Sequence, residues 1–308
     1  MMTAALLTVR QWPWDKRLTL MFPALTLLIA ITSGSLAEIQ PTDNKAALSG
    51  GAIFIALIFL CRANMAHFSE KTRWFLYQFW PVPAILLGYL SMRIFRLELA
   101  IEQFAIPQQD TLMIAIDQWL FGTTIPQLLQ YHISPTLTLL MESAYLHFYY
   151  LLPIGSLLYF HFRDDRLTFL RLRHGIVTTL AGGFCFYFLL PVEGPISFIA
   201  NQFVVPLTAN HEIVYDAVNS FRFAYDCFPS LHTAIPWVTL LIAWPKVNIP
   251  LRLIMLAMTL AITASTMYLR YHYGADVIAG LIWAGAVGWV IHQRRDIVTF
   301  TTNQAMVS

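Results

Sequence analysis

The chain has 308 residues, of which 57% are hydrophobic and only 12% are charged. Soluble domains carry about 25% charged residues, so this composition excludes a water-soluble globule. The 19 basic and 17 acidic residues give a net charge of +2, which is too balanced and too sparse for a nucleic-acid-binding face. The three cysteines, Cys61, Cys185 and Cys227, have no CxxC spacing and predict neither a zinc site nor a disulfide framework. We interpret them as isolated small apolar residues.

Apolar runs of about 20 residues, bounded by charge, proline or glycine, predict transmembrane helices. Eight such runs follow one another, near residues 18–34, 46–61, 74–92, 135–160, 175–191, 231–245, 250–269 and 276–292. The last three are separated by short connections, which predicts helical hairpins with tight turns. The expected fold class is all-α, a polytopic membrane helical bundle with about eight transmembrane helices.

The positions of the basic residues predict how this bundle is oriented. Fourteen of the 19 lie at one set of helix ends. The other five are Lys45, Arg93, Arg96, Arg222 and Arg270. This excess places both termini in the cytoplasm and the loops after the first, third, fifth and seventh helices outside. A signal peptide ending near residues 34–37 is a competing interpretation of the first run, and its cleavage would leave the sidedness of the rest unchanged.

Two outer segments are longer than a connection requires. Residues 96–134 mix spaced apolar residues with acids and are interrupted at Pro107 and Gly122, which predicts amphipathic helix lying at the membrane interface. Residues 192–230 are irregular, and they either carry substrate contacts or form a loose tether. The predicted organisation is therefore N-terminal transmembrane helices at 1–95, an interfacial segment at 96–134 and a catalytic transmembrane domain at 135–295.

The first cluster of chemically capable residues lies at the entrance to the helix predicted at 231–245. Ionisable groups at membrane depth are costly, so each needs a partner or a function. Ser230 is a good N-cap and Pro229 ends the preceding chain, so the helix begins there with free backbone amides and the positive end of its dipole outward. Such an end binds phosphate, and His232 in the first turn can face the same anion.

The second cluster spans residues 268–276, Tyr-Leu-Arg-Tyr-His-Tyr-Gly-Ala-Asp. His272 and Asp276 are four residues apart and share one helix face if the segment is helical, a condition that Gly274 leaves open. A carboxylate bonded to one imidazole nitrogen fixes the tautomer and leaves the other nitrogen free as a nucleophile or base. Both clusters lie on the same predicted side, as metal-free phosphoryl transfer requires. Taken singly, each cluster is also typical of interfacial anchoring residues.

These two motifs resemble the type 2 phosphatidic acid phosphatase superfamily and, within it, the inositol phosphorylceramide synthase branch. The resemblance is carried by residues 229–232 and by residues 268–273 with Asp276, Val277 and Gly280. Weaker likenesses are at residues 117–122, in the aromatic run 145–153 and at residues 191–195. Together they cover about residues 115–285 and imply a six-helix phosphatidic acid phosphatase-like core.

The resemblance also implies roles for individual residues. His272 would attack phosphorus to form a phosphohistidine, Asp276 would orient it, and His232 would protonate the leaving group. Ser230, the nearby amides and Arg270 would hold the phosphate oxygens. No metal and no other cofactor is implied.

The chain departs from the superfamily pattern in two places. The Ser-Arg that usually precedes the second histidine falls at residues 265–266, without the arginine, and Arg270 one turn later would supply that charge. The usual Lys-x6-Arg-Pro motif is absent. The most similar segment, at 166–174, is interpreted as a basic loop on the cytoplasmic side of the membrane. Arg222 is the better substitute as a phosphate ligand, with a plain surface arginine as the equal alternative.

Glu142 is a further anomaly, because it lies about two turns inside the helix predicted at 135–160. An acid at that depth usually faces the bundle interior and pairs with a hydroxyl or a base. It is either part of a packing pair or, with Tyr145 and Tyr149, a weak contact to a hydroxyl-rich headgroup or acceptor.

The sequence therefore predicts an integral membrane enzyme with its site on the extracytoplasmic face. It would pass a phosphorus-containing, inositol-phosphate-like headgroup from a membrane phospholipid donor to a lipid or polyol acceptor through a phosphohistidine. Hydrolysis by water, as in a lipid phosphate phosphatase, is the alternative. A transporter would need polar residues at mid-membrane in repeated halves, which the sequence does not show. A structural anchor would leave both histidine motifs unexplained, and a nucleic-acid partner is not expected.

Overall fold

The structure is a computed structural model that describes residues 13–38, 64–207 and 211–294, with a few positions between 48 and 60. The chain forms two compact units, one of residues 1–105 with 217–224 and one of residues 106–216 with 225–308. All regular elements in the described residues are helical, which confirms the all-α prediction. A lone β-bridge joins Val192 to Asp226.

The first unit is built around two packed helices. Its elements are α2 (Trp14–Thr32), η1 (Ser35–Glu38), η2 (Met65–His67), α4 (Glu70–Phe79), α5 (Pro81–Ile94) and α6 (Leu97–Gln103). α2 packs on α5, where Thr26 Oγ1 lies 2.7 Å from Ser91 Oγ and a Cβ at Gly88 would meet the Phe22 ring at 2.7 Å. These helices match the predicted runs at 18–34 and 74–92, whereas the run at 46–61 lies mostly outside the described residues.

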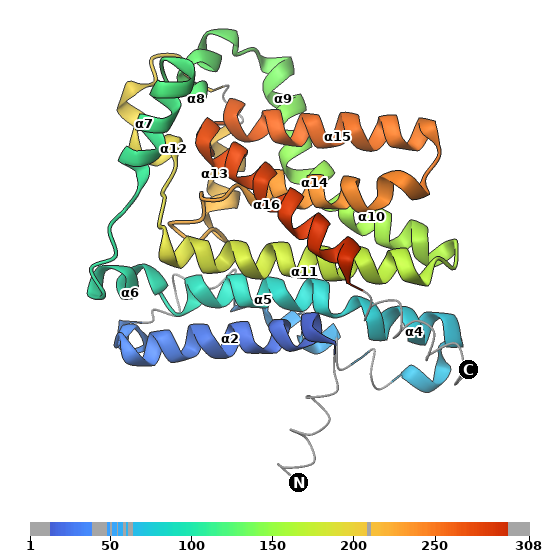
Figure 1. Ribbon diagram of the computed structural model, residues 1–308. Coiled ribbons are helices and arrows are strands. Elements are labelled where there is room, and N and C mark those ends of the chain that lie inside the picture. The colour runs from blue at the N-terminus through green and yellow to red at the C-terminus, as the bar shows by residue number, and fades with distance from the viewer. Residues whose placement is uncertain are drawn as a thin grey trace. The chain divides into compact units, whose positions relative to one another are not determined.

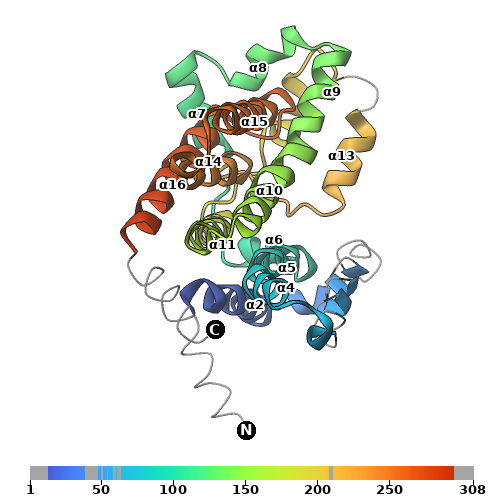
Figure 2. The same cartoon turned by 90° about the vertical axis from the view of Figure 1, so that its right-hand side faces the viewer.

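The second unit is a helical bundle centred on α14 (Figure 1). Its elements are α7 (Asp110–Phe121), α8 (Ile125–Leu129), η3 (Gln130–His132), α9 (Pro135–Ser143), η4 (Ala144–Phe148), α10 (Tyr149–Phe162), α11 (Arg166–Leu189), α12 (Pro195–Phe198), η5 (Ala200–Gln202), α13 (His211–Asn219, whose last residues belong to the first unit), α14 (Leu231–Ala243), η6 (Trp244–Lys246), α15 (Ile249–Tyr268) and α16 (Gly274–Gln293). α14 packs against α10, α11, α15 and α16. Figure 2 views α11, α14 and α15 nearly along their axes.

The boundaries of these helices follow local sequence signals. Asp165 caps α11 by accepting hydrogen bonds from Thr168 N at 3.0 Å and Thr168 Oγ1 at 2.7 Å. α11 therefore starts nine residues before the predicted run at 175–191. Arg173 and His174 are therefore buried on the helix, and the segment 166–174 is not a loop, whereas its cytoplasmic side stays a prediction.

α14 and α16 approach each other closely because Gly280 has no side chain. A Cβ at this position would lie 2.5 Å from the Ser230 carbonyl oxygen and 3.1 Å from Thr233 Cβ. Ser230 N also donates a hydrogen bond of 3.1 Å to the Asp276 carbonyl oxygen. The start of α14 and the first turns of α16 are therefore held side by side.

Three helices in the described part of the chain are long and apolar enough to cross a membrane. The first is Glu70–Ile94, a continuous segment made of α4 and α5. The other two are α15 and α16. The count of about eight spans is not confirmed and stays a prediction for the remaining helices.

Two acids of the interfacial segment predicted at 96–134 face the protein interior. Asp110 and Asp117 on α7 are fully buried, whereas Leu112, Trp119 and Phe121 are exposed. α7 ends at Gly122, whose φ of 80° is the left-handed conformation that favours glycine, so the predicted interruption is confirmed. This distribution suits a helix whose apolar face meets lipid and whose carboxylates serve the structure beneath.

The orientation in the membrane can be tested at two exposed positions of the second unit. Ile213 on α13 is 73% exposed, and Asp164 is exposed between α10 and α11. In a background without native cysteines, Ile213→Cys should react with an impermeant maleimide on intact cells, and Asp164→Cys only after permeabilisation, because the basic residues place them on opposite sides. The reverse labelling pattern would invert the topology.

Candidate active site

The first histidine motif opens α14 as the sequence predicts. Ser230 is the N-cap, and its Oγ accepts hydrogen bonds from Thr233 N at 3.3 Å and Thr233 Oγ1 at 3.1 Å. Ser230 is fully buried, whereas His232 in the first turn of the helix is half-buried. The N-cap prediction is confirmed, and His232 lies beside the positive end of the α14 dipole.

The second motif forms the turn between α15 and α16. Arg270 adopts a left-handed conformation with φ 65°, and the backbone N–H groups of Tyr271 and His272 both donate to the Thr266 carbonyl oxygen, at 2.9 Å and 3.1 Å. α16 begins only at Gly274, so His272 precedes the helix and does not share a helix face with Asp276. The condition that Gly274 left open in the sequence is therefore not met.

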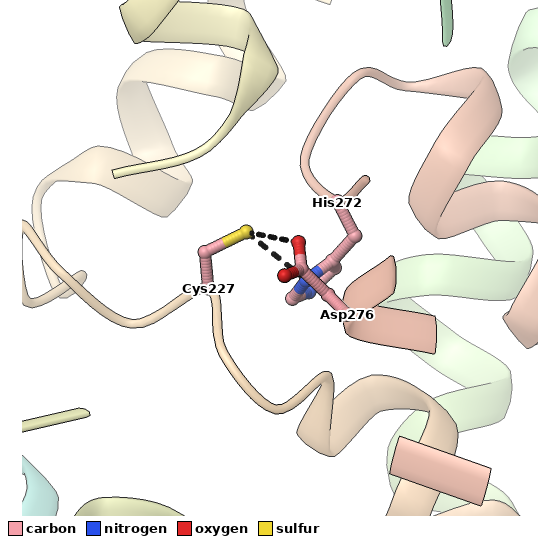
Figure 3. A group of neighbouring side chains, drawn as sticks. All are labelled: Cys227, His272 and Asp276. Carbon is pink, nitrogen blue, oxygen red and sulfur yellow. Dashed lines mark hydrogen bonds and ion pairs between the residues drawn. The ribbon is translucent and has the colours of Figure 1, made fainter. Parts of the chain in front are cut away.

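His272 and Asp276 nevertheless meet, together with Cys227 (Figure 3). His272 Nδ1 lies 3.7 Å from Asp276 Oδ2. Cys227 Sγ lies 2.8 Å from the same carboxylate oxygen and 3.3 Å from His272 Nδ1. All three side chains are buried. The interpretation of Cys227 as an isolated apolar residue is wrong, and its place two residues before the Pro229–His232 motif is the only signal that the sequence offers.

These three residues are also the group best able to hold a metal ion among the described residues. The sulfur, an imidazole nitrogen and a carboxylate oxygen lie within 4.8 Å of one another. Such a mixed donor set suits zinc better than magnesium or calcium, which prefer oxygen ligands. The expectation of a metal-free site stays a prediction.

His232 lies between two tyrosine rings. The Tyr145 ring is stacked on it with centroids 4.0 Å apart and planes at 13°, and the Tyr149 ring lies 4.1 Å away at 31°. Two rings cannot both fit this close to one face, so they cover opposite faces of the imidazole. Aromatic faces are negative, so a cation placed between two of them is attracted to both rings.

Both tyrosines come from a π-helical turn and the residue that follows it. The η4 turn covers Ala144–Phe148, within the otherwise α-helical stretch that starts in α9 and ends in α10. Such turns are frequent at functional sites because the extra residue changes which side chains share a face. The His232 and His272 ring centroids are 6.3 Å apart, so the two histidine motifs converge on one site.

Two buried aspartates of α7 hold the loops that carry this site. Asp117 accepts hydrogen bonds from the backbone N–H groups of Ala275 at 2.7 Å, Gly274 at 2.9 Å and Ile125 at 3.4 Å. Burial raises the pKa of the Asp117 carboxyl above its ordinary value, and these amide bonds partly offset that effect. The start of α16, with Asp276 in its first turn, is thereby fixed to α7.

Asp110 fixes a second loop in the same way. Its carboxylate accepts hydrogen bonds from Glu193 N and Gly194 N, both at 2.9 Å, and from the Tyr273 hydroxyl at 3.1 Å. Burial and the neighbouring carboxylate raise the pKa of Tyr273, so the phenol stays protonated and remains a donor. Sequence reasoning placed both aspartates on an amphipathic helix and missed this supporting role.

Comparison with known protein families gives a match. The PAP2 superfamily matches residues 111–290, which include both histidine motifs and Asp117 of α7. The chain belongs to this superfamily. Neither a comparison with curated proteins nor one with solved structures gave a match. Membership indicates a lipid phosphatase or phosphotransferase, and with the three apolar helices it indicates an integral membrane protein.

The two arginines predicted to bind phosphate differ in their surroundings within this PAP2 protein. The Arg270 guanidinium is largely buried, donates through Nη2 to the Val205 carbonyl oxygen and lies 4.2 Å from the centroid of the Phe203 ring. Burial lowers the pKa of Arg270, although an arginine remains charged at neutral pH. Arg222 belongs to the first unit, where its carbonyl oxygen accepts a hydrogen bond from Arg93 Nη1 at 2.6 Å. These contacts of Arg270 and Arg222 do not show whether either arginine binds phosphate, so that role stays a prediction.

Glu142 pairs with a base, as its depth in the PAP2 bundle predicts. Its Oε1 lies 3.1 Å from Nδ1 of His211, and both side chains are buried. The His211 ring centroid is 6.2 Å from that of Tyr271, the residue before His272. Sequence reasoning did not single out His211.

The segment around His211 is not a loose tether of the PAP2 domain. Ile196, Leu207 and Tyr215 pack against a buried cluster that includes Tyr145 and Tyr271. In its described residues, this segment therefore lies against the walls of the site.

Replacing Asp117 tests whether it holds the site together. Asp117→Ala should lower the free energy of unfolding by about 1–3 kcal/mol for each buried amide left without an acceptor, since such groups are costly. Glu102→Ala is the matched control because Glu102 is an exposed acid. Thermal unfolding in detergent measures both variants, and equal unfolding temperatures would contradict the role of Asp117.

Proposed function

We propose that this protein is a metal-independent lipid phosphotransferase that works through a phosphohistidine. The observation that carries the proposal is the convergence of His232, His272 and Asp276 in one site, with the two imidazole centroids 6.3 Å apart. A phosphorus atom between two imidazoles can meet a nucleophile on one side and a proton donor on the other, which is what transfer through a covalent intermediate requires.

In the first step, His272 is the nucleophile. Its Nδ1 faces Cys227 and Asp276, so Nε2 is the nitrogen that attacks phosphorus. The N–P bond forms as the bond between phosphorus and the lipid ester oxygen breaks, and His232 gives its proton to that leaving oxygen. The tyrosine rings around His232 support this role because they favour the protonated imidazole that an acid must start from.

In the second step, an acceptor hydroxyl replaces the lipid. A lipid or polyol hydroxyl attacks phosphorus, His232 takes its proton, and the N–P bond to His272 breaks, which restores both histidines. Water in place of the hydroxyl would give hydrolysis. The amides at the start of α14, Ser230 and Arg270 are the proposed ligands of the phosphate oxygens.

The proposed headgroup is inositol-phosphate-like, in line with the resemblance to inositol phosphorylceramide synthases. Support for a hydroxyl-rich ligand comes from the buried Glu142–His211 pair, which lies near the Tyr271 ring and offers both a hydrogen-bond donor and an acceptor. Tyr145 and Tyr149 add aromatic surface beside the same histidine site. The proposed location is the extracytoplasmic face of the membrane.

The proposal is tested with phospholipids labelled in the headgroup phosphate, supplied to purified protein with and without a lipid alcohol and in the presence of a chelator. Label in a new lipid only when the alcohol is present would support the transferase. Label released into water at the same rate in both cases would identify a phosphatase. Loss of activity in the chelator would contradict metal-independent chemistry.

His272→Ala should remove nearly all turnover, because the proposed covalent intermediate forms on its Nε2. The variant should still fold. Asp276→Asn should lose a large fraction by leaving the imidazole misoriented. His147→Ala is the matched control, since His147 is an exposed histidine of η4. Headgroup transfer and trapping of the phosphoenzyme measure these variants, and near-normal turnover in His272→Ala would end the mechanism.

His232→Ala should slow cleavage of natural lipid esters by about two to four orders of magnitude, the range for general acid catalysis. Its effect on an activated aryl phosphate ester that the enzyme accepts should be far smaller, because a nitrophenolate leaves without a proton. Steady-state rates on the two substrates make the comparison. Equal losses on both would show that His232 binds phosphate or supports the site instead.

A further inference from the structure

We propose that Cys227 is a positioning residue that links His272 to Asp276 through its thiol. In this arrangement the sulfur accepts the N–H of His272 Nδ1 and donates its own proton to Asp276 Oδ2. The effect on turnover rests on the function proposed above, whereas the hydrogen-bonded arrangement itself does not.

The three distances favour a bridge over a direct pair. His272 Nδ1 and Asp276 Oδ2 are 3.7 Å apart, which is longer than a hydrogen bond between nitrogen and oxygen. The sulfur lies 3.3 Å from the nitrogen and 2.8 Å from the carboxylate oxygen. A thiol is both a donor and an acceptor, so one group can satisfy both neighbours.

Cys227 is held so that its sulfur stays at this point. Its backbone N donates to the Val192 carbonyl oxygen at 3.2 Å, and the side chain is 1% exposed within a cluster that includes Met113 and Tyr273. Gly194 makes room for the sulfur, because a Cβ there would lie 3.2 Å from Sγ and 2.7 Å from the Tyr271 carbonyl oxygen. That carbonyl is 3.2 Å from the sulfur and is a second acceptor for the thiol proton.

The bridge determines which nitrogen of His272 is protonated. When the S–H of Cys227 donates a hydrogen bond to Asp276, the sulfur can only accept a hydrogen bond from His272. Nδ1 of His272 must therefore carry a hydrogen. Nε2 then keeps its lone pair, which is the form that attacks phosphorus. Without the bridge, a carboxylate 3.7 Å away fixes the tautomer less well.

Two substitutions and a matched control test this arrangement. Cys227→Ala removes the donor and the acceptor, whereas Cys227→Ser keeps both. Cys185→Ala is the control, because Cys185 is an exposed cysteine of α11. Cys227→Ala should lower kcat by about 10- to 100-fold, the range seen when the hydrogen-bond partner that orients a metal-binding histidine is removed, with KM little changed. Cys227→Ser should recover most of this loss, and Cys185→Ala should match the unmodified chain.

A second measurement does not depend on turnover. In protein labelled with ¹⁵N-histidine, with the His272 signal assigned by its loss in His272→Ala, we expect one tautomer, protonated at Nδ1, in the unmodified chain and in Cys227→Ser. Cys227→Ala should show a mixture of the two tautomers. If no substrate is turned over, this result still decides the arrangement, so failure of the proposed function and failure of the bridge are distinguishable.

Three results would overturn the proposal. The first is a Cys227→Ala protein that keeps its kcat and its single His272 tautomer. The second is a Cys227→Ser protein as slow as Cys227→Ala although both unfold at the same temperature, because hydrogen bonding would then not be what the sulfur supplies. The third is loss of activity in a chelator with recovery on adding zinc, which would make Cys227 a metal ligand.

Discussion

Three fully buried carboxylates determine where the chain lies around the candidate site. A carboxylate taken out of water must accept hydrogen bonds to compensate for its lost hydration. Asp110, Asp117 and Asp276 do so largely with backbone N–H groups of neighbouring loops. Each loop is thereby held at a fixed distance from a rigid helix. The positions of the two histidines follow from that constraint, because one lies in such a loop and the other on the helix packed beside it.

Small residues make this arrangement compact. Within a membrane bundle, helix association depends on close packing, since lipid is as apolar as the side chains it replaces. Gly280 lets α16 lie against the start of α14, and Gly194, with φ 101°, lets its loop pass over the Tyr271 carbonyl oxygen. A larger residue at either point would move the backbone that presents His232 or His272. The conformation of the turn at Arg270 adds a local cost of about 1–2 kcal/mol, which the surrounding contacts must offset.

The sequence predicts most of the helices and both histidine motifs because these depend on local patterns. Apolar runs and caps such as Ser230 define helix ends, and the spacing of His272 and Asp276 indicates a pair even though a helix face does not join them. Contacts between distant segments leave no such pattern. Cys227 contacts Asp276, which is 49 residues away in the sequence, and Glu142 contacts His211, which is 69 residues away. A thiol also looks apolar in a sequence.

The sequence also does not indicate whether the polar face of an amphipathic helix points toward water or toward the protein interior. The pattern of α7 predicts an amphipathic helix, but in a membrane protein the polar side can face either water or the interior. Asp110 and Asp117 face inward because the loops there have N–H groups that need acceptors. The π-helical turn that brings Tyr145 to His232 is equally hidden, since one additional residue per turn changes the face on which later side chains lie.

The tyrosine rings on both faces of His232 have a geometric consequence for any ligand. With those faces covered, only the rim of the imidazole is open to a bound molecule, and a proton can travel only within the plane of the ring. An ester oxygen must therefore come to the imidazole edge-on. Bulky groups on either side of that oxygen have to lie along the gap between the two phenol rings. The two rings therefore set the angle at which any ligand can reach the imidazole.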